Sequence, residues 1–310
     1  MIRPVFLAAC SCLIALSAAT LRAGEDARRR LEVAQFVAEG AFRDFTIPGV
    51  AAVQHAKALA DWKRLYAKEA PAHLETDRFL IYGTGDDKKL KDVGLMLDKT
   101  YDLAAKTLDM EFVKPWTGKL AVFVVQDRGE FQSLVRILEK RRAEEDEQGV
   151  YEIDDDNPHV LAGPPVFKSD LSAEQHAGAQ VGAALLMRKV GRAVPHWAQL
   201  AFGRASAVRA GPAKDLSAEH KRAAMVAKTR GIKNILGKGS ADPEEIAVIQ
   251  ASLMEYLAYS GRTAKFMPFI KGFQVSDTKM EATIEMALEA ANLPADKLDG
   301  VWKAWVKTLK

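Results

Sequence analysis

Hydrophobic residues recur with two different periods along this chain, and the change of period predicts the fold class. Apolar residues return every three or four positions, as on one face of a helix, in three stretches of the first half: 50–66, 86–108 and 128–142. Two compact apolar runs, typical of buried strands, alternate with these helices: 79–82 and 120–125. A shorter run, 159–162, predicts an edge strand, and the acidic stretch 144–156 before it predicts an irregular connector.

Helical patterning dominates the remainder of the chain. Two neighbouring helices are predicted at 174–189 and 195–204, since Gly191 favours the end of a helix and Pro195 its first turn. After residue 209 the chain is predicted to be helical to its end. The sequence therefore predicts an α+β fold, with a small mixed sheet and helices in the N-terminal half and an α-helical C-terminal half.

The C-terminal half contains clear helix signals. A helix is predicted over 217–230, and Asp242 with Pro243 predicts the start of another that runs to about Tyr259. The last helix carries Trp302 and Trp305, three positions apart and so on one face. We interpret this aromatic pair as core packing and not as a platform for a ligand.

The first 23 residues have the pattern of a secretory signal peptide. Arg3 provides a positive start, an apolar run follows over 4–19, and small residues lead to a cleavage site expected after Ala23, with Ala19 as the second choice. The run is short for a membrane span, which disfavours an uncleaved anchor. Lipidation at Cys10 is disfavoured because most of the apolar run follows this cysteine. We expect an exported protein, which is periplasmic, in the cell envelope or secreted.

These patterns divide the chain into four segments: a signal peptide (1–23), an N-terminal helical segment (24–72), a strand–helix region that holds the helix pair (73–208) and a helical C-terminal subdomain (209–310). The charge is nearly balanced, with 44 basic and 41 acidic residues, which gives no support for nucleic-acid binding. Both cysteines, Cys10 and Cys12, lie in the signal segment, so the processed chain has no thiol nucleophile. No stable membrane insertion is expected after signal cleavage.

Several short motifs follow one another in a characteristic order. They are the strand 79–82, the strand 120–125 with Gln126-Asp-Arg128, Glu130-Phe131, Gly149-Val-Tyr151, the helix pair with Val194-Pro-x-Trp197, residues 250–257, Gly272 and Trp302-x-x-Trp305. Their order resembles the peptidase-MA-like family of exported bacterial proteins, which are of the gluzincin zinc-peptidase type. The resemblance implies a metallopeptidase-like fold from about residue 74 to 310. It also implies an active site on the helix pair, with His-Glu-x-x-His on the first helix and Trp-x-x-Glu-Gly on the second.

The residues that would perform zinc chemistry are replaced in this helix pair. At the usual distance from Pro195, the first motif falls on residues 179–183. Alanine then stands in place of both histidine ligands, glutamine in place of the glutamate base and leucine in place of the third ligand. These degenerate-site positions are Ala179, Ala183, Gln180 and Leu200. We therefore assign no catalytic residue, no metal ligand and no cofactor.

A second register keeps one histidine but does not restore the site. Moving the motif three residues earlier places His176 at the first ligand, Ala177 at the general base and Gln180 at the second ligand. A neutral amide oxygen is a poor zinc ligand beside imidazole, so a rebuilt metal site is the less favoured interpretation. His176 is instead grouped with His196 and Trp197 as candidate residues of the former substrate cleft.

The sequence thus predicts an exported pseudo-peptidase with a binding or scaffolding role. Its expected partner is a polypeptide segment or an envelope protein, an expectation that rests on analogy with the fold. Two alternatives remain open. One is a metal-dependent hydrolase or peptidase with a non-standard site, and the other is a structural cell-envelope protein.

Overall fold

The computed structural model describes residues 49–66, 71–84, 86–153, 157–165, 171–235, 241–260, 262–274 and 283–309. The predicted signal peptide, 1–23, and the helical segment up to residue 48 lie outside these ranges. The described helices include none that is both long and apolar enough to cross a membrane.

A five-stranded mixed sheet lies in the N-terminal half of the described chain. Its strands, in spatial order, are β1 (Ala72–Glu75), β2 (Phe79–Gly83), β3 (Leu120–Val124), β5 (His159–Ala162) and β4 (Gly149–Glu152). The three central strands run parallel, and β1 and β4 pair antiparallel at the two edges. The two predicted central strands, β2 and β3, are buried along their whole length, as their continuous apolar sequences require.

Two predictions about the sheet were wrong. Strand β5 is internal and not at an edge, because β4 pairs with its outer side. Strand β4 itself falls in the stretch that was predicted to be an irregular connector. It has only four residues, two of them partly exposed, and acidic residues precede it, so its local pattern is weak. Its pairing with β5 defines it as a strand.

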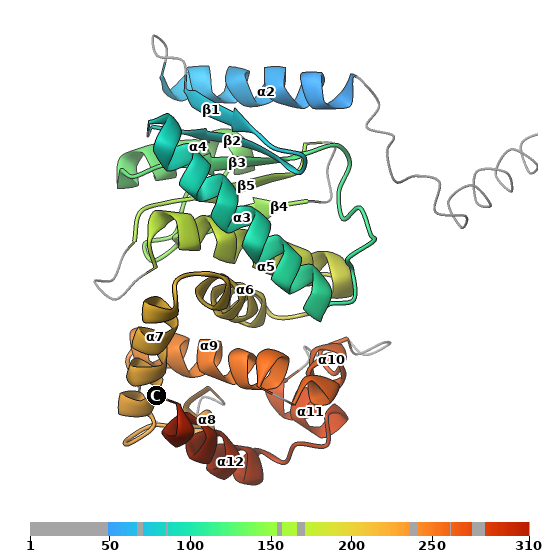
Figure 1. Ribbon diagram of the computed structural model, residues 1–310, viewed down its shortest axis with the longest axis vertical. Coiled ribbons are helices and arrows are strands. Elements are labelled where there is room, and N and C mark those ends of the chain that lie inside the picture. The colour runs from blue at the N-terminus through green and yellow to red at the C-terminus, as the bar shows by residue number, and fades with distance from the viewer. Residues whose placement is uncertain are drawn as a thin grey trace, which may run out of the picture. The chain divides into compact units, whose positions relative to one another are not determined.

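Helices cover both faces of the sheet (Figure 1). Helices α2 (Val50–Leu65) and α4 (Arg128–Glu139) pack on one face, where Trp62 and Phe131 join Phe123 of β3 in one buried cluster. Helices α3 (Asp87–Thr107) and α5 (Ala173–Val190) cover the other face. Local signals define the helix starts, because Asp86 and Asp127 each cap a helix by accepting a hydrogen bond from a backbone N–H.

Helix α6 (His196–Ala210) packs unusually closely against α5. The carbonyl of Ala179 and the amide nitrogen of Ala183 border Gly203, where an added Cβ would lie 2.8 Å from that nitrogen. An added Cβ on Gly182 would lie 2.9 Å from the Cα of Gly203. The absence of side chains at these glycines therefore lets the two backbones touch.

Helix α5 starts and ends within one residue of the predicted 174–189, whereas α6 starts within one residue of the predicted position but ends six residues after the predicted end at 204. Ser172 and Gln175 form a capping box at the start of α5, and Gly191, with φ +83°, follows its last residue. Pro195 immediately precedes α6. These signals are local in sequence, which is why both helices could be predicted.

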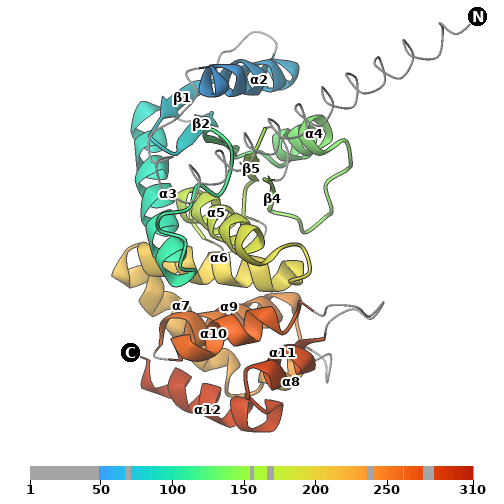
Figure 2. The ribbon, with the colours of Figure 1, turned by 90° about the vertical axis from the view of Figure 1, so that its right-hand side faces the viewer.

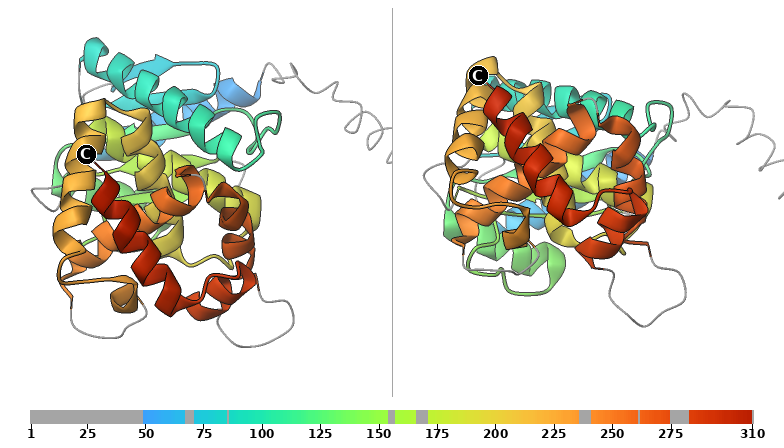
Figure 3. Two further views of the ribbon diagram at one scale, coloured as in Figure 1. Left: turned by 60° about the horizontal axis from the view of Figure 1, so that its bottom comes forward. Right: turned by 90° about the horizontal axis from the view of Figure 1, so that it is seen from below.

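The C-terminal half is helical in the described ranges. Its helices are α7 (Ala213–Val226), α8 (Ile232–Ile235), α9 (Pro243–Tyr259), α10 (Thr263–Lys271), α11 (Ile284–Ala290) and α12 (Ala295–Thr308). Helix α6 separates these helices from the sheet layer (Figure 2), and α12 lies nearest the viewer when this half is seen from below (Figure 3). The predicted α+β class is confirmed. The helix expected at 217–230 begins and ends four residues earlier, with Pro212 as its N-cap.

Candidate functional site

An open cleft of about 850 Å³ lies beside the β4 edge of the sheet. One wall is formed by the end of α4, the loop 140–148 and β4, and the other by α5, the α5–α6 turn and the first half of α6. The start of α9 contributes Pro243 and Ala247. The tertiary fold thus brings an edge strand and the helix pair to opposite sides of one cavity.

Strand β4 turns part of its backbone toward this cleft. The carbonyl of Gln148 accepts a hydrogen bond from the Gly163 N–H at 2.8 Å, which sets the alternation of the antiparallel ladder. Val150 and Glu152 therefore direct their N–H and C=O groups to β5, whereas Gly149 and Tyr151 direct theirs to the opposite side. Gly149 and Tyr151 also line the cleft. Within the described residues no strand pairs with this side of β4, and the cleft is thus bordered by a free hydrogen-bonding edge of the sheet.

Gln180 of α5 lies over this edge strand. Its side chain is 3% exposed, lines the cleft, and its Oε1 has no hydrogen-bond partner in the part of the chain that the structure describes. A Cβ on Gly149 would lie 2.5 Å from Nε2 of Gln180 and 2.8 Å from its Cγ. The glycine therefore makes room for the amide, which covers the face of β4.

The remaining degenerate-site positions lie in two different environments. Ala179 and Leu200 line the cleft from α5 and α6. Ala183 is fully buried and does not reach the cavity. His176, the histidine of the second register, donates a hydrogen bond from Nε2 to the Gln148 carbonyl oxygen at 2.6 Å, and so connects α5 to the residue before β4.

The other two predicted cleft residues lie at the start of α6. Trp197 lines the cleft and packs edge-on against Phe273, with ring centroids 6.1 Å apart. His196 is exposed at the mouth of the cleft, 5.9 Å from the ring of Tyr151 between centroids. All three residues that were grouped as cleft candidates therefore border the same cavity.

Tyr151 and Gln199 form a polar bridge across the cleft that the sequence did not indicate. The Tyr151 hydroxyl donates to the side-chain carbonyl of Gln199, and Nε2 of Gln199 donates to the Val194 carbonyl at 2.6 Å. Burial raises the pKa of Tyr151, with the charge of Arg192 acting in the opposite direction, so its hydroxyl stays protonated. In the sequence, Gly149-Val-Tyr151 contributed only to the family resemblance, and no local pattern pointed to the contact between Tyr151 and Gln199.

His196 is expected to titrate below the usual range of an imidazole. The side of the ring that faces the cleft loses part of its hydration, which lowers the pKa of His196 from 6.5, and the charges of Glu147 and Glu144 only partly oppose this effect. A depressed folded-state pKa means that neutral His196 stabilises the fold above pH 6.5, and that this contribution is lost as the pH falls through the folded pKa. An NMR titration should give a pKa below 6.5 in the folded protein. His196→Gln should reduce the loss of stability toward acid pH, and an unchanged acid dependence would contradict this prediction.

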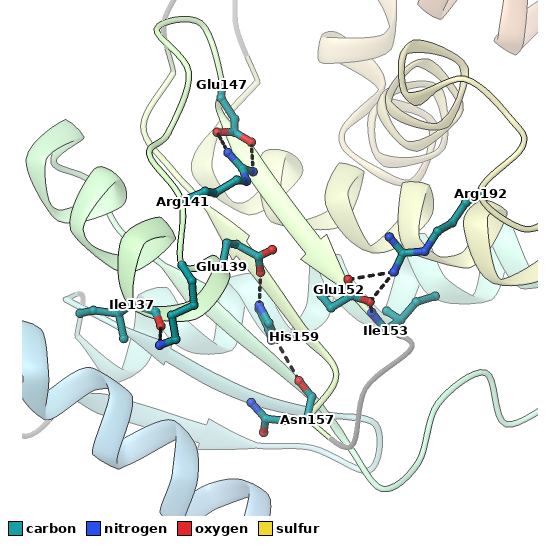
Figure 4. A network of polar contacts seen from close by, with 10 residues as sticks. Ile137, Glu139, Arg141, Glu147, Glu152, Ile153, Asn157, His159 and Arg192 are labelled. Atoms are coloured by element: carbon teal, nitrogen blue, oxygen red, sulfur yellow. Dashed lines mark hydrogen bonds and ion pairs between the residues drawn. The ribbon is translucent and has the colours of Figure 1, made fainter. Parts of the chain in front are cut away.

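Ion pairs hold the rim of the cleft (Figure 4). Arg192 of the α5–α6 turn pairs with Glu152 at the end of β4, with 2.9 Å between Nη2 and Oε2. Arg141 and Glu147 pair within the loop 140–148, with 2.8 Å between Nη1 and Oε2. Burial alone would raise the pKa of Glu147, but the hydrogen bonds from Arg141 and the Glu144 N–H and the charge of Arg141 give a net lowering. The Glu147 carboxylate is thus kept ionised, and its oxygens accept hydrogen bonds from groups of the same loop.

The loop 140–148 is also held from below. The guanidinium of Arg128 donates to the backbone carbonyls of Glu144, Glu145 and Glu147. His159, beneath the loop, shares a hydrogen bond with Glu139 at 2.7 Å. These contacts give the outer wall of the cleft a defined shape.

The groups around the cleft are suited to binding through hydrogen bonds. Within the described ranges, no three His, Cys, Asp or Glu side chains are grouped as they would be to hold a metal ion. The polar groups that do converge are the free edge of β4, the Gln180 amide, the His196 imidazole and the Tyr151–Gln199 bridge.

Comparison with known proteins does not assign the chain to a family. No protein-family model matches it, and no curated protein matches it.

Proposed function

We propose that this protein is an exported pseudo-peptidase that binds an extended polypeptide segment without cleaving it. The observation that carries the proposal is the free edge of β4, which borders a cleft of about 850 Å³. An unpaired strand edge offers alternating N–H and C=O groups, and an extended peptide is the ligand that satisfies them by adding a further strand.

The size of the cleft suits a short segment. At about 3.3 Å per residue, the four residues of β4 offer an edge of roughly 13 Å, which pairs with four or five residues of a bound chain. Tyr151 and Trp197 provide apolar surface in the same cleft, and aromatic side chains contribute strongly to binding.

The α5–α6 packing supports the non-catalytic part of the proposal. Ala183, which stands in place of one histidine of a zinc peptidase, is fully buried, and α6 touches the α5 backbone at Gly203. Apolar residues are consistent with a site without metal, because unligated histidines and glutamates there would be buried polar groups without partners. The resemblance to peptidase-MA-like proteins and the export signal belong to the proposal on sequence grounds.

The test uses a fluorescently labelled, permanently unfolded casein as the binding probe. Tyr151→Pro removes the N–H that faces the cleft but leaves the pairs of Val150 and Glu152 with β5 intact. Tyr151→Ala is the matched control, because it removes the same side chain and keeps the N–H. Fluorescence anisotropy should show the proline variant binding about tenfold more weakly than the alanine variant, through one lost hydrogen bond and a steric block to strand addition.

The outcomes separate the functional alternatives. Equal binding by the two variants, with both folded by circular dichroism, would argue against strand addition. Zinc bound at one ion per chain, with casein hydrolysis that stops on chelation, would support a hydrolase with a non-standard site. A partner that stays bound at fixed stoichiometry through purification would support a structural envelope protein.

A further inference from the structure

The side chain of Gln180, which lines the cleft, has a buried hydrogen-bonding atom that is unused within the described residues. Its side chain is 3% exposed, yet Oε1 has no hydrogen-bond partner within the described residues. A buried acceptor without a partner costs free energy, and nearly all such groups in native proteins are satisfied. Gln180 lines the cleft, so a rotation of its amide toward the cavity would let a bound molecule provide the missing donor.

The position of the amide determines which part of a bound strand it can meet. The Cβ that Gly149 lacks would point from the sheet toward α5 and would collide with the Gln180 side chain. The amide therefore lies above the face of the sheet, where side chains project, and not in the plane that contains backbone hydrogen bonds. In paired strands, residues directly opposite each other place their side chains on the same face, with Cβ atoms about 4.5–5.5 Å apart.

We propose that Gln180 selects the bound segment by the side chain opposite Gly149, with a preference for an uncharged hydrogen-bond donor: serine, threonine, asparagine or glutamine. The proposal rests on the proposed function, since it assumes a strand paired with β4. The Gln180 side chain fills the space that a side chain at Gly149 would fill. From there it contacts the bound residue that pairs with Gly149. Gln180 is then a specificity-determining residue that lies on α5 and reads a residue paired with β4.

The chemistry of the amide excludes other side chains. A hydroxyl can both donate and accept, so it satisfies either end of the Gln180 amide. An aliphatic side chain leaves Oε1 without a partner. An ionised carboxylate has only acceptors, and an ammonium group loses more hydration than a hydroxyl when it enters a buried site.

A pair of alternating peptides tests the proposal without knowledge of the register. The probes are labelled decapeptides with neutral ends, (Thr-Lys)5 and (Val-Lys)5, which have the same charge and length. Side chains alternate between the two faces of a strand, so every threonine or every valine lies on one face. Threonine and valine have the same branched shape and differ by a hydroxyl in place of a methyl group.

The measured quantity is the ratio of the two dissociation constants. Wild-type protein is expected to favour the threonine peptide, and this preference should be about tenfold greater than in Gln180→Met, which keeps the length of the side chain and removes the amide. Gly149→Ala should also reduce the preference, because its Cβ displaces the Gln180 amide. Gly149→Ala changes the position of the Gln180 amide and leaves its chemistry unchanged. The ratio measured on wild-type protein tests the preference even if a variant does not fold.

Each result has a separate meaning. Binding of both peptides with the same ratio in wild type and Gln180→Met would overturn the selection by Gln180 and leave strand binding in place. Failure of wild type to bind either peptide would overturn the selection together with the proposed function. A preference for the valine peptide in wild type would also overturn the selection.

Discussion

Gly203→Ala is expected to lower the free energy of unfolding by about 3 kcal/mol or more, among the largest effects of any single substitution in this chain. The new Cβ would overlap the carbonyl oxygen of Ala179 and lie 2.8 Å from the amide nitrogen of Ala183. Both obstacles are backbone atoms of α5, so no side chain can rotate to make room. The two helices must separate, and the contacts between them are lost along the whole pair.

Urea unfolding of the purified protein measures this effect. Gly300→Ala is the matched control, because Gly300 is also helical and exposed, and an added Cβ there meets nothing within 4 Å. It should stabilise the protein by about 0.4–1 kcal/mol, through the lower conformational entropy of alanine in the unfolded chain. A Gly203→Ala protein as stable as wild type would show that α5 and α6 do not approach as closely as described.

Trp302→Ala is the second substitution with a large expected effect, and should cost about 3–5 kcal/mol. Trp302 is fully buried in the C-terminal half, and its indole N–H donates to the Ser252 hydroxyl at 3.1 Å. Removal of the ring leaves a cavity between α12 and α9 that the surrounding helices can fill only in part. Trp302→Phe keeps most of the volume and should cost less, because the Ser252 hydroxyl also donates to the Ile249 carbonyl.

Trp305 provides the comparison for this experiment. It is partly exposed and contacts Tyr256, with ring centroids 5.1 Å apart. Trp305→Ala should therefore cost about 1 kcal/mol, the scale of a single aromatic contact. Thermal and urea unfolding of both variants would test the interpretation of the pair as core packing. Equal and small effects from the two substitutions would contradict it.

The sequence predicted those parts of the fold that depend on neighbouring residues. Helices α5 and α6 could be placed because Gly191 and Pro195 act within one helical turn. Strands β2 and β3 were predicted because both faces of a central strand are buried, which produces a continuous apolar run. Strand β4 was missed because pairing with β5 stabilises it. Its own four residues are too few and too exposed to show a strand pattern.

The candidate site shows the same division. The pattern of the helix pair pointed to Gln180, Leu200, His176, His196 and Trp197, all of which border one cleft. It gave no indication of Tyr151 and Gln199, which are 48 residues apart and meet only in the fold. Nor could it show that Ala183 is enclosed between helices whereas Ala179, four residues earlier, reaches the cavity.

The sequence by itself determined the α+β class and the helix pair, because both are recorded in residue type and short-range spacing. Only the tertiary structure decided that the outer edge of β4, which no other described strand pairs with, lies opposite this helix pair and that a buried amide lies over it. Both features depend on residues distant in the chain, Gly149 and Gln180, whose contact requires the sheet and α5 to pack together. The helix pair is thus one wall of a cleft whose other wall is β4.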